Sequence, residues 1–94
     1  MVFGDRMFYH VAIMTHSHST KLEKECNLTK EEVRIRFGKP YENGSNLFIN
    51  GTVKKHNDIE RIKVFSTNFE LIEHAPTVKD GDISWDPLPE VTKE

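Results

Sequence analysis

Two histidines, His16 and His18, form an H-x-H pair, with His10 and Cys26 close by in the sequence. Side chains at i and i+2 share a face of a β-strand, so the pair could supply two ligands to a zinc ion. The remaining ligands would form an irregular set, because no C-x-x-C or H-x₃-H spacing is present. We therefore expect two solvated turn histidines and no cofactor, with a small-ligand or metal-binding domain as an alternative.

Cys26 with a histidine also has the residue types of a nucleophile and its base. No local motif supplies an orienting third group or an oxyanion site, so we expect a half-buried structural thiol and no enzymatic activity. The pairs Glu31-Glu32 and Asp80/Asp82 have the residue types of acid–base or divalent-metal chemistry. The first pair suits a helix N-terminus, and the second has too few neighbouring ligands for an EF-hand.

Basic residues form a larger candidate set, which predicts a small nucleic-acid-binding module as an alternative function. The set consists of Arg34, Arg36, Lys39, Lys54, Lys55, Arg61 and Lys63. With an exposed aromatic such as Tyr41, it would suit RNA or single-stranded nucleic acid, where stacking supplements phosphate contacts. Acidic residues such as Glu31 and Glu60 lie among these positions, and no RNP, KH or dsRBD motif is present. A solvated surface is therefore the expected outcome.

Length and composition limit the classes of protein to which this chain can belong. The chain has 94 residues, enough for one small domain with a thin core. No apolar run approaches the roughly 20 residues that span a bilayer. The apolar stretch 7–14 is short, contains His10 and follows Asp5, so it does not fit a signal peptide. Because the single cysteine cannot form an internal disulfide, we expect a reducing compartment and therefore a cytoplasmic protein. From the lack of a long apolar run we expect no membrane partner.

The segment 40–67 contains the clearest turn signal. Asn50-Gly51 follows the apolar run Leu47–Ile49 and precedes a β-branched pair. This dipeptide predicts a type I′ hairpin, since both central residues of that turn adopt positive φ. A short helical or 3₁₀ turn is expected next, followed by the second apolar run, Ile59–Phe65. Within this run Arg61-Ile62-Lys63-Val64 alternates polar and apolar residues, as a half-buried strand does.

Two further segments have strand patterns. Met7–Met14 is apolar on both alternating faces, so we place it at the centre of a sheet. Lys21–Leu28 is charged and is expected as an edge strand beside it, because charges along an edge discourage association with other sheets.

Thr29 marks the clearest helix start. Thr29-Lys30-Glu31-Glu32 matches a capping box, in which Thr29 and Glu32 bond each other's backbone N–H groups. Val33 and Phe37 would then face a sheet one turn apart, and Gly38 followed by Pro40 is expected to end the helix. Residues 33–37 also alternate with period two, so a strand is the competing interpretation.

The C-terminal part lacks a regular pattern. Residues 71–94 carry 6 Asp/Glu against 2 Lys/Arg, and prolines and a glycine interrupt them. We predict a single α+β domain over residues 1–74, followed by an acidic mobile tail or linker over 75–94. Trp85, the only tryptophan, is either an exposed anchor for a partner or a residue that folds back onto the core.

A series of short motifs extends over roughly residues 7–67. They are Asn27-Leu28-Thr29, Glu31-Glu32, Arg36-Phe37, Pro40-Tyr41, Phe48-Ile49-Asn50-Gly51 and Asp58-Ile59-Glu60-Arg61-Ile62-Lys63. In this order they resemble a small domain at the N-terminus of some bacterial proteins that carry a TIR-like predicted nucleotide-binding domain or otherwise belong to defence-type effector systems. The resemblance implies an accessory sensor, adaptor or docking module, because the enzymatic or nucleotide-binding part of such proteins lies in another domain.

The expected fold is therefore α+β, a small and mainly antiparallel sheet of three or four strands with one helix packed on a face. The expected function is a non-enzymatic protein-interaction module. Its partner is expected to be another protein, or a second copy that pairs along an exposed sheet edge. The surface residues expected to contribute are Tyr41, Phe48, Lys54, Lys55 and Trp85.

Overall fold

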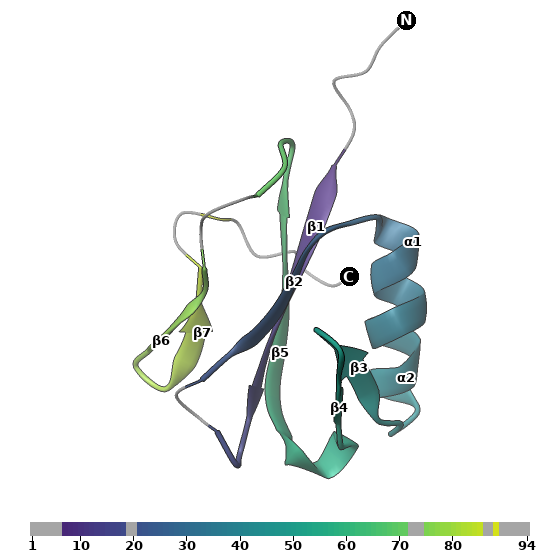
Figure 1. Ribbon diagram of the computed structural model, residues 1–94, viewed down its shortest axis with the longest axis vertical. Coiled ribbons are helices and arrows are strands. Elements are labelled where there is room, and N and C mark those ends of the chain that lie inside the picture. Colours follow the sequence, from purple (N-terminus) through teal and green to yellow (C-terminus); the bar gives the residue numbers. More distant parts are fainter. Residues whose placement is uncertain (1–6, 19–20, 72–74, 86–87, 89–94) are drawn as a thin grey trace, which may run out of the picture.

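The sheet at the centre of the molecule is three-stranded and antiparallel, in the order β2-β1-β5 (Figure 1). Its strands are β1 (Phe8–Thr15), β2 (Glu23–Leu28) and β5 (Ile59–Thr67). The computed structural model describes residues 7–18, 21–71, 75–85 and 88. The predicted α+β class is confirmed, as is the placement of the apolar strand at the centre and the charged strand at an edge.

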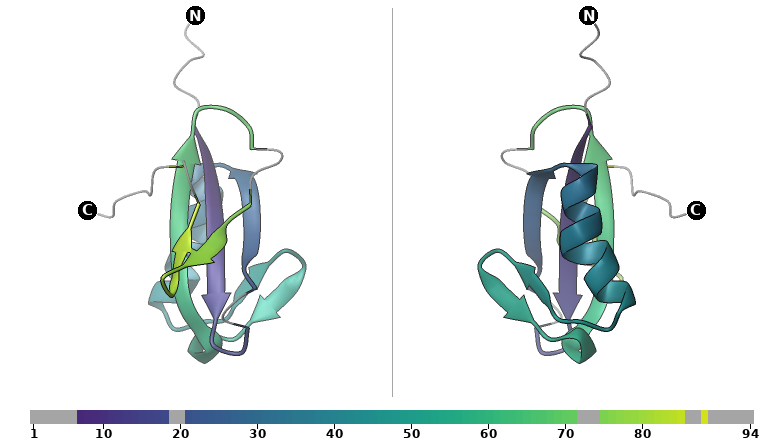
Figure 2. Two further views of the ribbon diagram at one scale, coloured as in Figure 1. Left: turned by 90° about the vertical axis from the view of Figure 1, so that its left-hand side faces the viewer. Right: turned by 90° about the vertical axis from the view of Figure 1, so that its right-hand side faces the viewer.

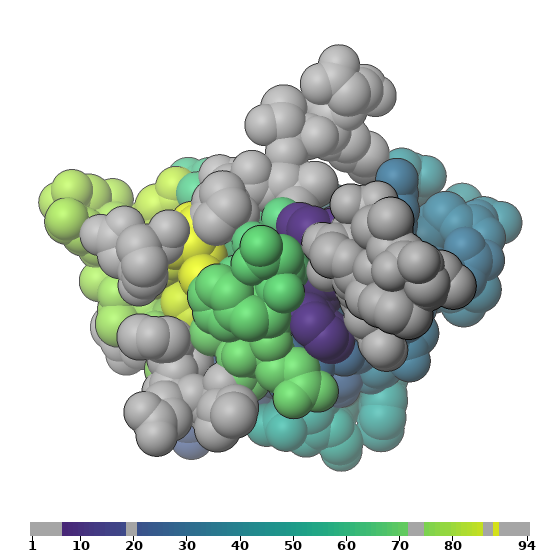
Figure 3. All heavy atoms as spheres, turned by 90° about the horizontal axis from the view of Figure 1, so that it is seen from above, coloured from purple at the N-terminus to yellow at the C-terminus, as the bar shows by residue number. Residues whose placement is uncertain are grey.

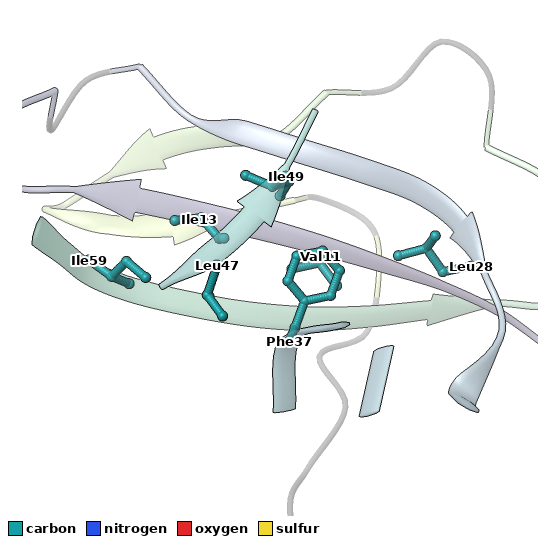
Figure 4. Packing of buried hydrophobic residues seen from close by; sticks show 7 residues of the cluster. All are labelled: Val11, Ile13, Leu28, Phe37, Leu47, Ile49 and Ile59. Carbon is teal, nitrogen blue, oxygen red and sulfur yellow. The ribbon is translucent and has the colours of Figure 1, made fainter. Parts of the chain in front are cut away.

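β1 is central because both of its faces are apolar. Val11 and Ile13 face one side, whereas Ala12 and Met14 face the other, and all four are at most 1% exposed. A hydrophobic cluster therefore covers each face of the sheet. The helix-side cluster consists of Val11, Ile13, Leu28, Phe37, Leu47, Ile49 and Ile59 (Figure 4). The other face is covered by a hairpin formed by residues 77–84, and we call its cluster the hairpin-side cluster. It consists of Ala12, Met14, Phe65, Leu71, Ile83 and Trp85.

The helix over the first face begins as predicted. Thr29 caps it: the Thr29 side chain accepts the Glu32 N–H at 3.0 Å, and the Glu32 carboxylate accepts the Thr29 N–H at 2.8 Å. Three helical elements then follow without interruption, namely α1 (Lys30–Val33), the π-helical turn η1 (Arg34–Gly38) and α2 (Lys39–Glu42). The competing strand over residues 33–37 is therefore wrong.

The predicted helix end at Gly38 is also wrong. In a regular α-helix Pro40 would lack one hydrogen bond and its ring would clash with the carbonyl four residues earlier. The π turn avoids this conflict, because the Lys39 N–H bonds the Arg34 carbonyl five residues back and the turn is locally wider. The helix therefore continues to Glu42, and Gly44, with φ of +73°, follows its end.

The Asn50-Gly51 hairpin is present as predicted, with φ of 54° and 76° at the two turn residues. It joins β3 (Leu47–Ile49) to β4 (Thr52–Lys54). Leu47 and Ile49 point into the helix-side cluster, which also contains Phe37 (Figure 4). The 3₁₀ turn η2 (His56–Asp58) then leads into β5.

A second hairpin covers the opposite face of the sheet (Figures 2 and 3). Asp80 and Gly81, with φ of 55° and 74°, connect β6 (Thr77–Lys79) to β7 (Asp82–Ser84). Trp85 follows it, 2% exposed, with its ring centroid 5.4 Å from that of Phe65. The predicted mobile tail is therefore wrong for residues 77–85, and Trp85 folds back onto the core. Residues 86–87 and 89–94 of that predicted tail lie outside the described part of the chain.

A buried polar network joins β1 to the end of β5. His10 is fully buried; its Nδ1 accepts the Asn27 N–H at 3.1 Å, so Nε2 carries the proton and donates to the Thr67 hydroxyl at 2.8 Å. Asn27, with φ of 61°, also pairs through its side chain with the N–H and carbonyl of Leu71. Burial lowers the pKa of His10 below its ordinary 6.5, so this histidine is a neutral structural residue.

Candidate interaction surface

The outer face of the β3–β4 hairpin carries two apolar side chains. Phe48 and Val53 lie directly opposite each other in the hairpin register and are 55% and 57% exposed. A two-residue turn fixes that register, and alternation along each strand turns both side chains away from Leu47 and Ile49. Val53 was not among the predicted surface residues. Its position followed from the Asn50-Gly51 turn, which places residue 53 opposite residue 48.

The other predicted partner-binding residues are not all brought to this surface. Tyr41 is half-buried against the helix-side cluster, with its ring 5.3 Å from that of His56. The Lys54 side chain is on the inner side of the hairpin, where its ammonium lies 3.3 Å from the Glu23 carboxylate. Lys55 is exposed just after β4. Trp85 lies in the cluster on the opposite face of the sheet and cannot contribute to a surface.

A polar seam holds the hairpin against β2. The Arg36 guanidinium binds both oxygens of Glu25, at 3.0 and 2.7 Å, and the Asn50 N–H donates to the same carboxylate at 2.8 Å. Glu23 accepts from the Asn50 side chain at 3.2 Å. The hydrogen bond from Arg36 holds the pKa of Glu25 below its usual range despite partial burial. The seam therefore fixes the position from which Phe48 and Val53 face solvent.

Most of the predicted nucleic-acid-binding cations have carboxylate partners within the protein. Arg34 pairs with Glu31, and Arg36 pairs with Glu25. Lys54 pairs with Glu23, whereas Arg61 and Lys63 share Asp82, at 3.3 and 2.9 Å. No carboxylate partner is described for Lys39 and Lys55. Because phosphate binding requires uncompensated positive charge, this arrangement supports a nucleic-acid interface poorly.

The loop after β1 brings polar side chains together without a catalytic arrangement. The Ser17 hydroxyl donates to Asp58 at 2.6 Å and lies 3.2 Å from His18 Nδ1. A nucleophilic serine would instead donate to the histidine, which the carboxylate would orient. His16 lies 3.8 Å from Glu60. Over residues 7–18, 21–71, 75–85 and 88, no group of three or more His, Cys, Asp or Glu side chains is placed to hold a metal ion.

Cys26 packs at the margin of the hairpin-side cluster, where burial raises the pKa of its thiol. A raised pKa disfavours the thiolate, which is the nucleophilic form. Two hollows lie on the described surface. One of ≈ 80 Å³ is lined by Thr15, His18, Lys21, Glu23 and Lys54. A larger one of ≈ 340 Å³ is open to solvent and is lined by Tyr41, Glu60, Arg61, Ile62 and Lys63.

Comparisons with protein families, with curated proteins and with solved structures found no match to this chain. Within the described residues, no helix has the length and apolar character needed to cross a membrane. The fold and surface define a small α+β domain that has an exposed apolar pair on a firmly held hairpin.

Proposed function

We propose that this chain is a non-enzymatic protein-interaction module that docks through the outer face of the β3–β4 hairpin. The observation that carries the proposal is the exposed pair Phe48 and Val53. Large apolar side chains that lie opposite each other on a sheet surface bury each other only partly, and aromatic residues are enriched at protein interfaces. The polar seam from Arg36 and Asn50 to Glu25 presents this pair in a fixed geometry, which lowers the entropic cost of docking.

The partner is another protein or a second copy of the chain. The expectation of an association with bacterial defence-type systems rests on the sequence resemblance to accessory domains of TIR-like proteins. Lys55, exposed just after β4, would lie at the margin of the docking surface as a contributing residue.

The test is a double variant, Phe48→Ser with Val53→Thr, compared with the wild type and with Ile35→Ser. Ile35 is 54% exposed on the helix and serves as a control for the loss of exposed apolar area. Light scattering at two protein concentrations measures self-association. A capture experiment with bacterial lysate, with and without nuclease treatment, measures binding to other proteins.

We expect self-association or specific capture by the wild type and the Ile35 variant, and loss of both by the double variant. Equal behaviour of all three chains would overturn the proposal. Capture that disappears with nuclease treatment would favour the nucleic-acid alternative instead.

A further inference from the structure

Two Asn-Gly dipeptides lie on the surface of the protein, in different surroundings. Asn50-Gly51 forms the turn between β3 and β4, whereas Asn43-Gly44 follows the end of α2. All four residues are exposed. Asparagine followed by glycine is chemically labile, because glycine has no side chain to hinder an attack of its backbone nitrogen on the asparagine side chain. Both dipeptides are therefore candidate sites of spontaneous deamidation.

The reaction needs only the two residues of the turn and water. The Gly51 nitrogen attacks Asn50 Cγ, so that an N–Cγ bond forms and the Cγ–Nδ2 bond breaks. Nδ2 leaves as ammonia and takes the proton that the attacking nitrogen loses. Water then opens the five-membered imide at either carbonyl carbon, adding its hydroxyl to that carbon and its proton to the ring nitrogen. The product is aspartate, or isoaspartate, in which the backbone runs through the former side chain. No oxidant or reductant takes part.

The fold leaves the reacting atoms of this turn accessible. The hairpin register pairs Ile49 with Thr52, and within the part of the chain that the structure describes the Gly51 N–H donates to no acceptor. A methyl group on Gly51 would meet no atom within 4 Å, and the turn lies at the margin of the molecule in both views of Figure 2. The reaction must release the Asn50 amide from Glu23, but this hydrogen bond is exposed to solvent.

The product would disrupt the polar seam between the hairpin and β2. Asn50 Nδ2 donates to Glu23 Oε1 at 3.2 Å, and the Asn50 N–H donates to Glu25 at 2.8 Å. A carboxylate at position 50 has no proton to donate and carries the same charge as Glu23, so repulsion replaces a hydrogen bond. Isoaspartate also adds one carbon to the backbone of a turn whose two-residue length fixes the hairpin register. Either product therefore weakens the attachment of the hairpin to β2.

We propose that Asn50 is a site of spontaneous deamidation and that its conversion to aspartate or isoaspartate releases the β3–β4 hairpin from β2. The released hairpin no longer holds Phe48 and Val53 in a fixed position, so docking through them becomes weaker. The reaction and the release do not depend on the proposed function, whereas the effect on docking rests on it.

The first test follows the reaction in the wild-type protein. The folded protein and a sample unfolded in urea are kept at neutral pH, and peptide mapping by mass spectrometry measures the replacement of the Asn50 amide by a hydroxyl group. Electron-transfer fragmentation distinguishes aspartate from isoaspartate. We expect Asn50 to react in the folded protein at no less than about one tenth of its rate in the unfolded chain, because about one hydrogen bond opposes the reaction. Conversion in the unfolded sample alone would overturn the inference.

The second test measures the release with Asn50→Asp, since Asp-Gly also forms type I′ turns and the substitution retains the turn. Amide hydrogen exchange in β3 and β4 should become about tenfold faster, whereas exchange in β1 and β5 should stay unchanged. Asn43→Asp is the matched control, because it makes the same change at an exposed Asn-Gly outside the seam. It should leave exchange in β3 and β4 unchanged. Adding Glu23→Gln to Asn50→Asp reverses donor and acceptor and should restore most of the protection.

Equal exchange in Asn50→Asp and the wild type would overturn the release of the hairpin, as would a failure of Glu23→Gln to restore protection. Light scattering and capture then compare docking by the wild type, Asn50→Asp and Asn43→Asp, and we expect weaker docking by Asn50→Asp alone. Undiminished docking by Asn50→Asp would overturn the effect on docking. Absence of docking by the wild type would contradict the proposed function instead, and the mass and exchange measurements would still decide whether Asn50 is modified and the hairpin released.

Discussion

The two hairpins of this protein have the same turn and opposite outer faces. Both use two residues of positive φ, Asn50-Gly51 in one and Asp80-Gly81 in the other, between strands of three residues. Both contribute apolar side chains to a core. The outer face of β6–β7 is polar, with Thr77 opposite Ser84 and Lys79 opposite Asp82. The outer face of β3–β4 instead carries Phe48 opposite Val53.

The difference between the two outer faces distinguishes the residues that folding requires from those that it does not require. β6–β7 alternates apolar and polar residues, as a hairpin with one solvent-exposed face does, whereas all three residues of β3 are apolar. Folding accounts for Leu47 and Ile49, which are at most 1% exposed, and leaves the exposed Phe48 without a structural role. This contrast is the physical basis for the proposal that the protein docks through the β3–β4 hairpin.

The largest expected change in the free energy of unfolding tests whether the cluster under β6–β7 stabilises the protein as much as the cluster under β3–β4 does. Trp85→Ala should lower the free energy of unfolding by about 3–5 kcal/mol, as should Phe37→Ala on the other face, because each leaves a large cavity. Urea unfolding followed by circular dichroism measures both variants. A change of less than about 0.5 kcal/mol for Trp85→Ala would mean that the hairpin-side cluster contributes little to stability.

A smaller loss of stability is expected from substitutions in the two turns, which can be compared directly. Gly51→Ala and Gly81→Ala should each destabilise the protein by about 1–2 kcal/mol, since an L-residue is disfavoured at positive φ. A methyl group at either position would meet no atom within 4 Å, so the effect is conformational and should be similar in the two hairpins. Thermal unfolding of the single variants measures it. A neutral Gly81→Ala variant beside a destabilised Gly51→Ala variant would show that β6–β7 does not need its turn.

Lowering the pH should reduce the stability that each face of the sheet contributes, over a different pH range for each face. The folded-state pKa of His10 lies below 6.5, so below pH 6.5 the unfolded chain binds a proton that the folded chain excludes. Stability should therefore fall as the pH decreases from 6.5, by at most about 1.4 kcal/mol per pH unit from this residue. Glu25, in the seam on the helix side, has a lowered pKa, so its contribution is lost only as the pH falls below its ordinary 4.5.

The measurement is urea unfolding between pH 7.5 and 5 for the wild type and for His10→Gln, which keeps a donor for Thr67 but does not titrate. The free energy of unfolding of the variant should depend less on pH over this range than that of the wild type. Identical pH profiles would mean that His10 does not cause the acid sensitivity.

The smallest expected effect concerns the outer face of β3–β4. Phe48→Ser and Val53→Thr should each change the free energy of unfolding by no more than about 0.5 kcal/mol, because both side chains are mostly exposed. Leu47→Ala, one residue away on the inner face, should destabilise by about 2–5 kcal/mol. Thermal unfolding compares them. A large loss of stability in the Phe48 variant would show that this residue serves folding, and the contrast between the two hairpins would lose its functional meaning.

Local chemistry determined much of this fold in advance. The apolar faces of β1, the capping box at Thr29 and the Asn50-Gly51 turn each depend on residues a few positions apart, and all three predictions are confirmed. The exposure of Phe48 followed from the same local rules. Asp80-Gly81 carried an equally clear turn signal, but the acidic and proline-containing sequence around it favoured the prediction of a mobile tail.

Only the tertiary structure decided the features that depend on distant residues. The π turn that admits Pro40, the burial of Trp85 against Phe65 and the pairing of Arg61 and Lys63 with Asp82 all require knowledge of which segments meet in space. Whether a tryptophan is an exposed anchor or a core residue depends on whether the fold offers an apolar surface on which it can pack. Whether a cation can bind a ligand depends on whether a neighbouring carboxylate already neutralises its charge. Composition and spacing identify these residues, whereas long-range packing determines what they can bind.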